Sequence, residues 1–411
     1  MSNKKYTLSI IRESRQDDNR TPLTPEQISK LLKTYDNLKI LVQPSKTRCF
    51  KDNDYYKAGA TLCEDISTSD IIFGVKEVEV SHLIENKTYI FFSHLSKIQK
   101  DTNQATQGTP GMNKKELLRE ILKRNITLID YENIRDNLGI RYLGFGRFAG
   151  IVGCYNTLNL HLNLERKIFL PRAFEIKKYE KIKEIINSQN FDKLKILLTG
   201  RGRAAQGAIE ILEHANFKKI PLKGYLNKKY NDPVYCNISA KEHVERNDNK
   251  SYSKEDFILN PNKYISKVKN YLTKTDIFIA CHYWNPKFPK LFSLEEIKKF
   301  KDLKIIGDIT CDINGSIPTT VRSTTIEKPY YSFDINSFQE THLNKEGIAI
   351  MAVDNLPSEL PRDSSEEFGK GVLSQVIPFL ITGDDGRIKN ATIVSKGKLC
   401  TLYDYLKYFI N

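Results

Sequence analysis

The sequence contains no run of about 18 consecutive apolar residues, the shortest stretch that normally spans a membrane as a helix. Its start, Met1–Tyr6, leads at once into a short β-like run and lacks the apolar stretch of a signal peptide. We therefore expect neither a membrane span nor a secretion signal.

Paired cysteine motifs are also missing. The seven cysteines form no CxxC pair and are odd in number, in a chain of 411 residues that does not need disulfides to stabilise its core. Apart from His94, discussed below, the histidines show no metal-ligand spacing. These absences predict reduced thiols, a cytoplasmic location and no metal site.

Clustering of charge is a further absence. Lys and Arg total 64 against 50 Asp and Glu, a net charge of +14, but acids are scattered among the bases over the whole length. This distribution favours a solvated Lys-rich surface over attraction of anionic small molecules or weak nucleic-acid contact. A nucleic-acid-binding protein would show a basic face with interleaved aromatics, so we expect no nucleic-acid partner.

What the sequence does contain is an alternation of β-like runs and amphipathic helical patterns, which favours parallel α/β sheets. A polar insertion, Asp101–Met112, interrupts the first series. The first series of strands is predicted at Tyr6–Ile11, Leu38–Val42, Asp70–Val75, Thr88–Phe92 and Thr127–Tyr131, with helices at Pro25–Tyr35 and Lys114–Arg124. After a long helix, Phe148–Leu162, the second series of strands is predicted at Leu194–Thr199, Asp276–Ala280, Lys304–Ile309 and Ile348–Val353.

The fold class predicted is α/β, with two Rossmann-like domains, parallel sheets and an interdomain cleft. Residues 1–145 are expected to form a substrate-binding domain, onto which C-terminal helices of about 360–411 pack back. Residues 146–359 are expected to form a dinucleotide-binding domain.

A glycine turn follows the strand Leu194–Thr199 and leads directly into a helix. Gly200 permits the tight turn, Gly202 lets the backbone approach a pyrophosphate, and Ala205 fits the small position where helix and strand pack. The alternative is an ordinary strand-to-helix turn with small residues for packing. The sequence context favours the dinucleotide site.

The acid that usually binds the adenosine ribose is expected about 20 residues after the turn, at the end of the next strand. The segment Pro221–Lys229 contains no acid. Asn227 or the lysines of this segment could meet a 2′-phosphate as easily as a hydroxyl, so the choice between NAD and NADP stays open.

Polar groups follow three predicted strands of the first domain, in Glu13–Thr24, Gly74–Glu77 and Phe91–Lys97. In open α/β sheets, ligand sites lie at these strand ends. Lys76 and His94 can share one cleft, where flanking cations would lower the lysine pKa enough to make it a base. The alternatives are that Lys76 is an ordinary surface lysine and that His94 is a strand-end histidine whose ring nitrogens are hydrogen-bonded within the protein.

At this point the motifs resemble a known superfamily, that of alanine dehydrogenase and saccharopine dehydrogenase, over nearly the whole chain. The first-domain signatures are Asn19–Pro25, Gly74–Glu77 and Phe91–His94. The resemblance narrows toward lysine-ketoglutarate reductase in Leu128–Glu132, Gly144–Gly150, Gly307–Ser316, Val353–Pro361 and Glu367–Gly369.

The resemblance implies an NAD- or NADP-dependent, reversible cleavage of saccharopine to lysine and 2-oxoglutarate. Lys76 would take the amine proton and His94 would act as acid and base during imine hydrolysis. By motif position, Arg20, Lys97 and Arg141 would bind the substrate carboxylates. Glu77 and Glu132 would neutralise the substrate ammonium or tune the basicity of Lys76. The cofactor side would include Gly200, Gly202, Arg203, Asp308, Asp312 and Asp354, although Asp312 could simply cap a turn and Asp354 a helix start.

The chain stops where bifunctional relatives would begin a second dehydrogenase domain, which implies a monofunctional lysine-forming enzyme. One alternative is an alanine-dehydrogenase-like or opine-type enzyme with another amino acid. Another is a non-catalytic dinucleotide sensor, since a fold does not fix a function. The insertion Asp101–Met112 follows the His94 segment, and its role, like the oligomeric state and the direction of flux, is open.

Overall fold

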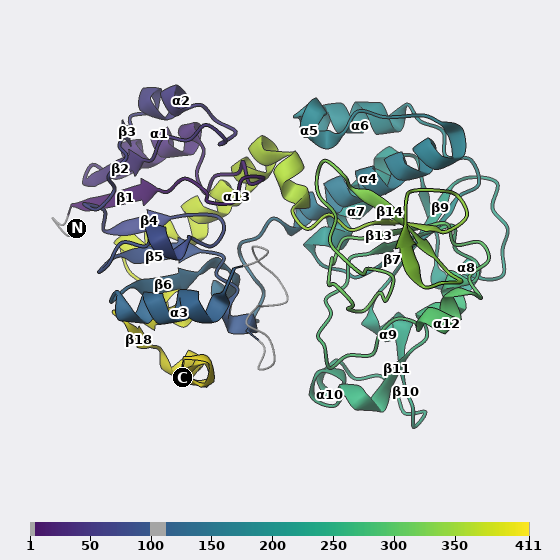
Figure 1. Cartoon of the computed structure of the whole chain (residues 1–411). Helices are drawn as coiled ribbons and strands as arrows, with labels where there is room; N and C mark the ends of the chain where they lie inside the picture. The colour runs from purple at the N-terminus through teal and green to yellow at the C-terminus, as the bar shows by residue number, and fades with distance from the viewer. Residues whose placement is uncertain (1–4, 99–111, 411) are drawn as a thin grey trace. The chain divides into compact units, whose positions relative to one another are not determined.

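The structure is a computed structural model that describes residues 5–98 and 112–410. The chain divides into two compact units. Unit 1 is Met1–Phe145 together with Pro361–Asn411, and unit 2 is Gly146–Leu360 (Figure 1). Apart from Met112, the polar insertion 101–112 lies outside the described residues. The interdomain cleft, and the assignment of substrate to one unit and nucleotide to the other, stay predictions.

Unit 1 contains an eight-stranded sheet in the order β18-β17-β6-β5-β4-β1-β2-β3. Its strands are β1 Tyr6–Ile10, β2 Leu38–Val42, β3 Thr61–Leu62, β4 Ile71–Phe73, β5 Thr88–Phe91, β6 Thr127–Asp130, β17 Thr392–Ser395 and β18 Lys398–Leu399. Strands β1 to β6 are parallel, whereas β17 and β18 add an antiparallel edge. The sheet is therefore parallel over its six strands β1 to β6, as predicted, and has an antiparallel edge in addition.

The helices of unit 1 are α1 Pro25–Thr34, α2 Asp52–Lys57, α3 Lys114–Lys123, α13 Pro361–Gln375, α14 Ile377–Ile381 and α15 Arg387–Ala391, with 3₁₀ turns at Val80–His82, Leu95–Lys97, Tyr131–Asn133 and Thr401–Phe409. Helix α1 begins at a capping box in which Thr24 accepts from the backbone of Gln27 and the Gln27 side chain accepts from the backbone of Thr24. Proline at the first helical position reinforces this start.

Both faces of the central strands are buried. In β4, Ile71 and Phe73 lie in one apolar cluster and Ile72 lies in another, on opposite sides of the sheet. Side chains alternate between faces along a strand, so a continuous apolar run is what a sheet covered on both sides requires.

Unit 2 contains a second eight-stranded sheet, in the order β15-β14-β16-β13-β12-β7-β9-β8. Its strands are β7 Lys195–Thr199, β8 Lys218–Lys219, β9 Val234–Ile238, β12 Ile277–Ala280, β13 Ile305–Asp308, β14 Tyr330–Asp334, β15 Gln339–Thr341 and β16 Ile348–Met351, and a separate two-stranded sheet joins β10 Val244–Arg246 to β11 Tyr264–Ser266. The other strands of this sheet are parallel, as predicted, and strands β14 and β15 add an antiparallel edge.

The helices of unit 2 are α4 Gly146–Arg166, α5 Ala173–Ile176, α6 Tyr179–Asn187, α7 Arg203–His214, α8 Leu222–Tyr225, α9 Ala240–His243, α10 Lys254–Leu259, α11 Val268–Leu272 and α12 Leu294–Ile297, with 3₁₀ turns at Pro261–Lys263 and Leu356–Glu359. The strands and helices expected from the sequence are present, and the long helix starts two residues earlier than expected and extends to Arg166.

The sheet order corrects one sequence expectation. The strand beside β7, which precedes the glycine turn, is β9 and not the next strand along the chain, β8. The ribose-side residue was sought near Tyr225, which follows β8. It has to be sought at the end of β9 instead, because β9, and not β8, pairs with the strand that precedes the turn.

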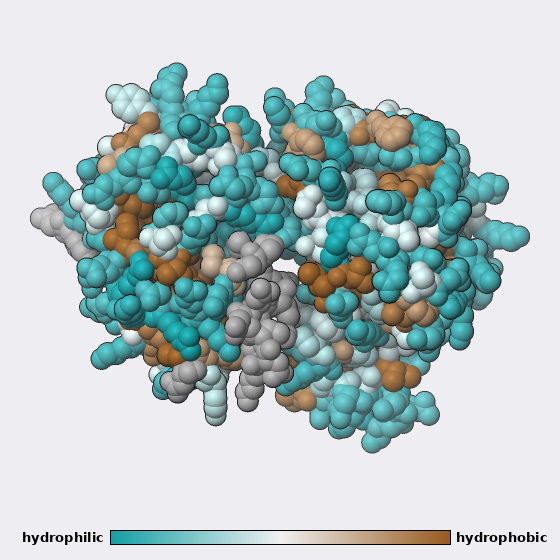
Figure 2. All heavy atoms as spheres, in the orientation of Figure 1, coloured by the Kyte–Doolittle hydropathy of each residue, from teal (hydrophilic) through white to brown (hydrophobic). Residues whose placement is uncertain are grey.

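Hydrophilic side chains cover most of the face shown in Figure 2, with smaller apolar patches between them. Many surface lysines pair with acids, as Lys181 does with Glu184. The seven cysteines are all free thiols. No helix within the described ranges 5–98 and 112–410 is both long and apolar enough to cross a membrane.

Candidate active site

Four neighbouring parallel strands of unit 1, β1, β4, β5 and β6, end at one edge of the sheet. Ile10 pairs with Phe73, Phe73 with Ile90, and Phe91 with Asp130. The polar segments that follow these strands therefore begin side by side. The edge includes β1, on either side of which the order of strands runs in opposite directions, and ligands bind at such switch points in open α/β sheets.

Glu77, which follows β4, holds two basic side chains through one carboxylate oxygen. Its Oε1 lies 2.6 Å from Nδ1 of His94 and also accepts a hydrogen bond from Nζ of Lys114. All three residues are buried. Burial by itself would raise the pKa of Glu77, but His94 and Lys114 hold it well below its usual range. Glu77 is thus an ionised carboxylate that orients the His94 ring.

His94 has an unusual backbone. Its φ of +55° lies in the left-handed region, which non-glycine residues rarely adopt. The residue lies between the end of β5 at Phe91 and the 3₁₀ turn Leu95–Lys97, and its ring stacks on Phe92 at 6.3 Å between centroids. Strained backbone of this kind persists only where the surrounding contacts impose it, and it clusters at functional sites.

Lys76 is the amine nearest to this pair in the chain, and it is half-buried. Burial lowers its pKa, as does the positive charge of Arg20, against the attraction of Glu77 and Asp18. Within residues 5–98 and 112–410, no side chain forms a hydrogen bond or ion pair with its Nζ. A lysine with a lowered pKa and an uncommitted amine can act as a base.

Arg20 lies in the loop after β1. Its Nε donates to Oδ1 of Asp18 at 2.8 Å, and its guanidinium stacks over the ring of Phe145 at 4.2 Å.

In the same loop, Glu13 accepts from the backbone N–H of Val75 and Lys76 at 2.7 and 2.8 Å. Burial, and then the charge of Asp18, raise the pKa of Glu13 to about 8. The loop thus joins β1 to the Lys76 backbone.

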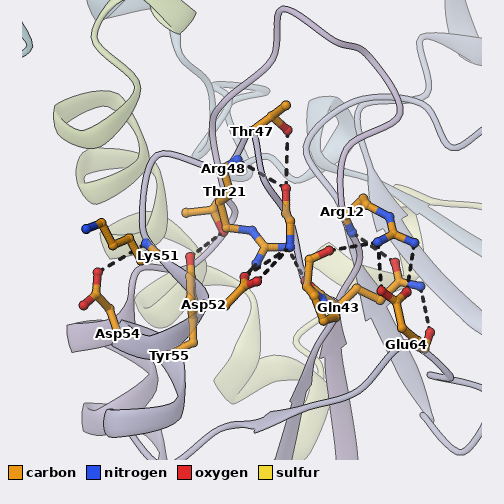
Figure 3. A network of polar contacts seen from close by, with 12 residues as sticks. Arg12, Thr21, Gln43, Thr47, Arg48, Lys51, Asp52, Asp54, Tyr55 and Glu64 are labelled. Atoms are coloured by element: carbon orange, nitrogen blue, oxygen red, sulfur yellow. Dashed lines mark hydrogen bonds and ion pairs between the residues drawn. The ribbon is translucent and has the colours of Figure 1, made fainter.

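Helix α2 contacts the same loop through the side chain of Tyr55, which Figure 3 shows hydrogen-bonded to Thr21. The hydroxyl of Tyr55 lies 3.0 Å from both Oγ1 of Thr21 and the carbonyl oxygen of Leu23. The guanidinium of Arg48 lies 5.2 Å from the centre of the Tyr55 ring and pairs with Asp52. These contacts fix the backbone directly after Arg20.

Glu132, which follows β6, accepts from two cations at Oε1. Nζ of Lys97 and Nη1 of Arg141 each lie 2.7 Å from this oxygen. Burial opposes ionisation, but Lys97, His94 and Arg141 together lower the pKa of Glu132 to about 2.

Neighbouring Asp130 accepts from the backbone N–H of Ser93, and burial raises its pKa. The three cations expected to hold substrate carboxylates, Arg20, Lys97 and Arg141, therefore each pair with a protein carboxylate here.

Several members of this cluster were not predicted from the sequence. Lys114 opens α3, and its spacing to Leu117, Leu118 and Ile121 puts it on the buried face of that helix, a signal present in the sequence. Glu13, Asp18 and Asp130 lie inside segments that were singled out, but no pattern marked these acids individually. Only the sheet register brings them together.

The glycine turn of unit 2 has the shape that a pyrophosphate requires. Gly200 has φ +98°, and a Cβ there would lie 2.5 Å from the carbonyl oxygen of Cys281. Around Gly202, no described atom beyond those of the glycine and its two chain neighbours lies within 4 Å of where a Cβ would be. Gly202 precedes α7 with no side-chain cap, which leaves the first N–H groups and the positive end of the helix dipole facing the turn. These residues fit a dinucleotide phosphate.

The small residues of α7 serve helix packing as well. Ala205 is fully buried, and a Cβ at Gly207 would lie 1.9 Å from the carbonyl oxygen of Arg147 in α4. A Cβ at Gly150 would meet the carbonyl oxygen of Ala204 at the same distance. The backbones of α4 and α7 therefore touch, and this contact places Arg203 at the start of α7.

The acids expected near the cofactor occupy two loops of unit 2. Asp308, at the end of β13, accepts from the hydroxyls of Thr310 and Thr320 at 2.6 Å each, and burial raises its pKa. Asp312 is almost buried in the following turn, and Asp354 lies between β16 and the turn Leu356–Glu359. Asp308 thus anchors its own loop, and a contact of these acids with a cofactor stays a prediction.

Across residues 5–98 and 112–410, no group of three or more His, Cys, Asp or Glu side chains is arranged to hold a metal ion.

Two family descriptions match the sequence. Residues 9–152 match "Alanine dehydrogenase/PNT, N-terminal domain" and residues 236–401 match "Alanine dehydrogenase/PNT, C-terminal domain". Together they extend over more than half of the chain.

Among curated proteins, the chain is 30% identical over 443 aligned positions to an alpha-aminoadipic semialdehyde synthase of Arabidopsis thaliana, covering 95% of this chain and 40% of that protein. The mitochondrial protein of the same name from Bos taurus is 29% identical, with 95% and 46% covered. The chain thus spans less than half the length of these relatives. A saccharopine dehydrogenase [NAD(+), L-lysine-forming] of Neurospora crassa is 25% identical, with 92% of this chain and 91% of that protein covered.

Two solved structures share the fold. An L-alanine dehydrogenase superposes with a TM-score of 0.64 at 13% identity, covering 98% of this chain and all of that one. A transhydrogenase from Sinorhizobium meliloti superposes with a TM-score of 0.61 at 14% identity, covering 96% and 100%. At these identities the likeness concerns the fold alone.

Proposed function

We propose, on the premise that this chain belongs to the alanine dehydrogenase/PNT family and is related to the lysine-forming saccharopine dehydrogenases, that it is an NAD(P)-dependent saccharopine dehydrogenase. The reaction is saccharopine, NAD(P)⁺ and water to lysine, 2-oxoglutarate, NAD(P)H and a proton. It acts on a CH–NH bond, is reversible, and belongs to lysine metabolism.

One observation supports the proposed reaction more directly than any other. Lys76, with its lowered pKa, lies at the same sheet edge as the ion-paired Glu77 and His94, beside the cationic Arg20. A base and a second proton carrier, surrounded by cations, are what the cleavage of an amine with several carboxylates requires.

In the cleavage direction a nicotinamide dinucleotide held by the glycine turn would supply the acceptor for the hydride that leaves the carbon attached to the secondary amine. Lys76 takes the amine proton, because burial and the positive charge of Arg20 lower its pKa and so favour the neutral amine. His94, oriented by Glu77, then moves protons between water and the carbon–nitrogen bond as the imine is hydrolysed.

Arg20, Lys97 and Arg141 bind the substrate carboxylates, with fixed cationic donors that suit this role. Each already pairs with Asp18 or Glu132, so a substrate carboxylate joins an existing charge network. Glu132 also offers a negative charge for the substrate ammonium.

In unit 2, the turn with Gly200 and Gly202 would hold the pyrophosphate of the cofactor through backbone N–H groups, with Arg203 at the start of α7. A cytoplasmic location belongs to the same proposal, and the seven free cysteines support it.

The test is the absorbance of the reduced nicotinamide with purified protein, lysine and 2-oxoglutarate. Runs with NADH and with NADPH, and controls with pyruvate and ammonia or with lysine and pyruvate, separate the reactions. Loss of absorbance only with lysine and 2-oxoglutarate is the expected result. Loss with pyruvate and ammonia instead would point to an alanine-dehydrogenase-like reaction, and nucleotide binding without turnover would point to a sensor.

A further inference from the structure

The ribose side of the nucleotide site in unit 2 contains a carboxylate that is already occupied and a cation that is exposed. The inference drawn from it deepens the proposed function and rests on its nicotinamide dependence. In the sheet of unit 2, β9 lies beside β7, and β8 lies at the far edge. In dinucleotide-binding sheets the adenosine ribose lies at the end of the strand next to the glycine turn.

The end of β9 is attached to the glycine turn. Thr199 pairs with Ile238, and the N–H of Gly200 donates to the carbonyl oxygen of Ile238 at 2.9 Å. Asn237 donates to the carbonyl oxygen of Gly200 at 2.7 Å. The segment directly after β9, Ser239–Glu242, therefore lies at the ribose side of the turn.

This segment contains one acid, Glu242, and its carboxylate already accepts hydrogen bonds from other groups of the protein. Oε2 accepts from the backbone N–H of Ser239 at 2.8 Å and also from the Ser239 hydroxyl, in a capping box of α9. Oε1 lies 3.6 Å from Nη2 of Arg201. An NAD-binding site needs a free acceptor for the ribose hydroxyls, and here Oε2 of Glu242 would first have to give up its hydrogen bonds from Ser239.

Cations, in contrast, are available. Arg201 belongs to the glycine turn itself, and its side chain is 67% exposed. Lys241, two residues after Ser239, is exposed as well. An exposed ion pair such as that of Arg201 with Glu242 has little stability of its own, so the guanidinium can turn to a stronger anion. Its planar fork matches a phosphate group.

We propose that unit 2 selects a dinucleotide with a 2′-phosphate, NADP(H), over NAD(H), and that Arg201 contacts this phosphate with Lys241 beside it. The lysines of Pro221–Lys229, considered from the sequence, are excluded from this role because they follow the edge strand β8.

The experiment measures dissociation constants of NADPH and NADH for the full chain by equilibrium fluorescence titration. The unaltered protein is expected to bind NADPH at least about tenfold more tightly than NADH. Arg201→Ala is expected to weaken NADPH binding about tenfold, the loss typical of one charge-assisted contact, and to change NADH binding less than twofold. Lys229→Ala is the matched control and is expected to leave both constants unchanged.

A second variant tests the same position by gain. Lys241→Asp replaces an exposed cation by a carboxylate at the ribose side, and is expected to lower the ratio of NADPH to NADH affinity at least about tenfold. Equal or tighter NADH binding by the unaltered protein, or an equal loss of both nucleotides in Arg201→Ala, would overturn the inference and leave the proposed function intact. Binding of neither nucleotide would overturn both.

Discussion

At the scale of single residues, the candidate site is a network of opposite charges taken out of water. Glu77 and Glu132 each accept from two basic side chains at one oxygen, and their pKa values fall although burial opposes this. Glu13 has no such cationic partner within hydrogen-bonding distance among the described residues, and its pKa rises. Whether a buried acid is ionised thus depends on its immediate neighbours.

Lys76→Met should retain nucleotide binding but lose most of its turnover, because the base would be replaced by an apolar side chain of similar length. Turnover and the dissociation constant of the reduced nucleotide are measured on the same preparation. Unchanged turnover would remove Lys76 from the mechanism.

Lys114→Met should lower the free energy of unfolding by about 3 kcal/mol, because it leaves Glu77 with one basic partner in a buried site. The folded-state pKa of Glu77 is lowered, so its contribution to stability is present above the unfolded value of about 4.3 and is lost as pH falls. The difference from the unaltered protein should therefore shrink below that pH. Urea unfolding measures both, with the exposed Lys123→Met as the control, and an equal loss in the two variants would contradict the assignment.

Glu13→Gln should flatten the pH dependence of stability. The pKa of Glu13 is raised to about 8, so the folded protein keeps a proton that the unfolded chain releases, and stability falls as pH rises from about 4.3 to 8. Glutamine does not titrate and keeps one acceptor oxygen, which can accept from one of the two backbone N–H groups. The free energy of unfolding of the variant, relative to that of the unaltered protein, should therefore rise by on the order of 3 kcal/mol between pH 4 and pH 7. Parallel curves across this range would disprove the shift.

At the scale of elements, close approach of two helix backbones explains why glycine occurs inside α4 and α7. Gly150 and Gly207 both lie mid-helix, where glycine costs about 1 kcal/mol relative to alanine. The contact between the two helices leaves no room for a Cβ at either position. Packing therefore outweighs helix propensity here.

Gly207→Ala should destabilise unit 2 by about 3 kcal/mol, since the new methyl group would collide with the carbonyl oxygen of Arg147 rather than with a flexible side chain. The neighbouring exposed residue gives the control, Gln206→Ala, expected within about 0.5 kcal/mol. Chemical denaturation measures the free energy of unfolding of both variants. A stabilised Gly207→Ala protein would show that the two helices can move apart without loss of stability.

At the scale of the whole molecule, the two units differ in how the chain builds them. Unit 2 uses one continuous segment, Gly146–Leu360. Unit 1 needs two, because β17 pairs with β6 at its sheet edge and Phe368 of α13 stacks on Phe145 at 4.4 Å between centroids.

A fragment of residues 146–360 should consequently fold alone and bind the nucleotide, since its sheet and core are complete within the segment. A fragment that ends at Leu360 should lose the structure of unit 1 but keep nucleotide binding, because unit 1 would lack β17 and α13. Limited proteolysis and nucleotide titration of both fragments test this. An intact unit 1 in the shorter chain would contradict it.

The sequence by itself determined the alternation of strands and helices, the glycine turn, and the segments that contain Arg20, Lys76 and His94. These features depend on local patterns, which are apolar periodicity, capping and turn chemistry. Only the tertiary structure decided that Lys114 shares Glu77 with His94, that Glu132 accepts from both Lys97 and Arg141, and that β9 rather than β8 flanks the turn. The physical reason is that partners and strand order depend on contacts between residues far apart in the chain, which no local pattern encodes.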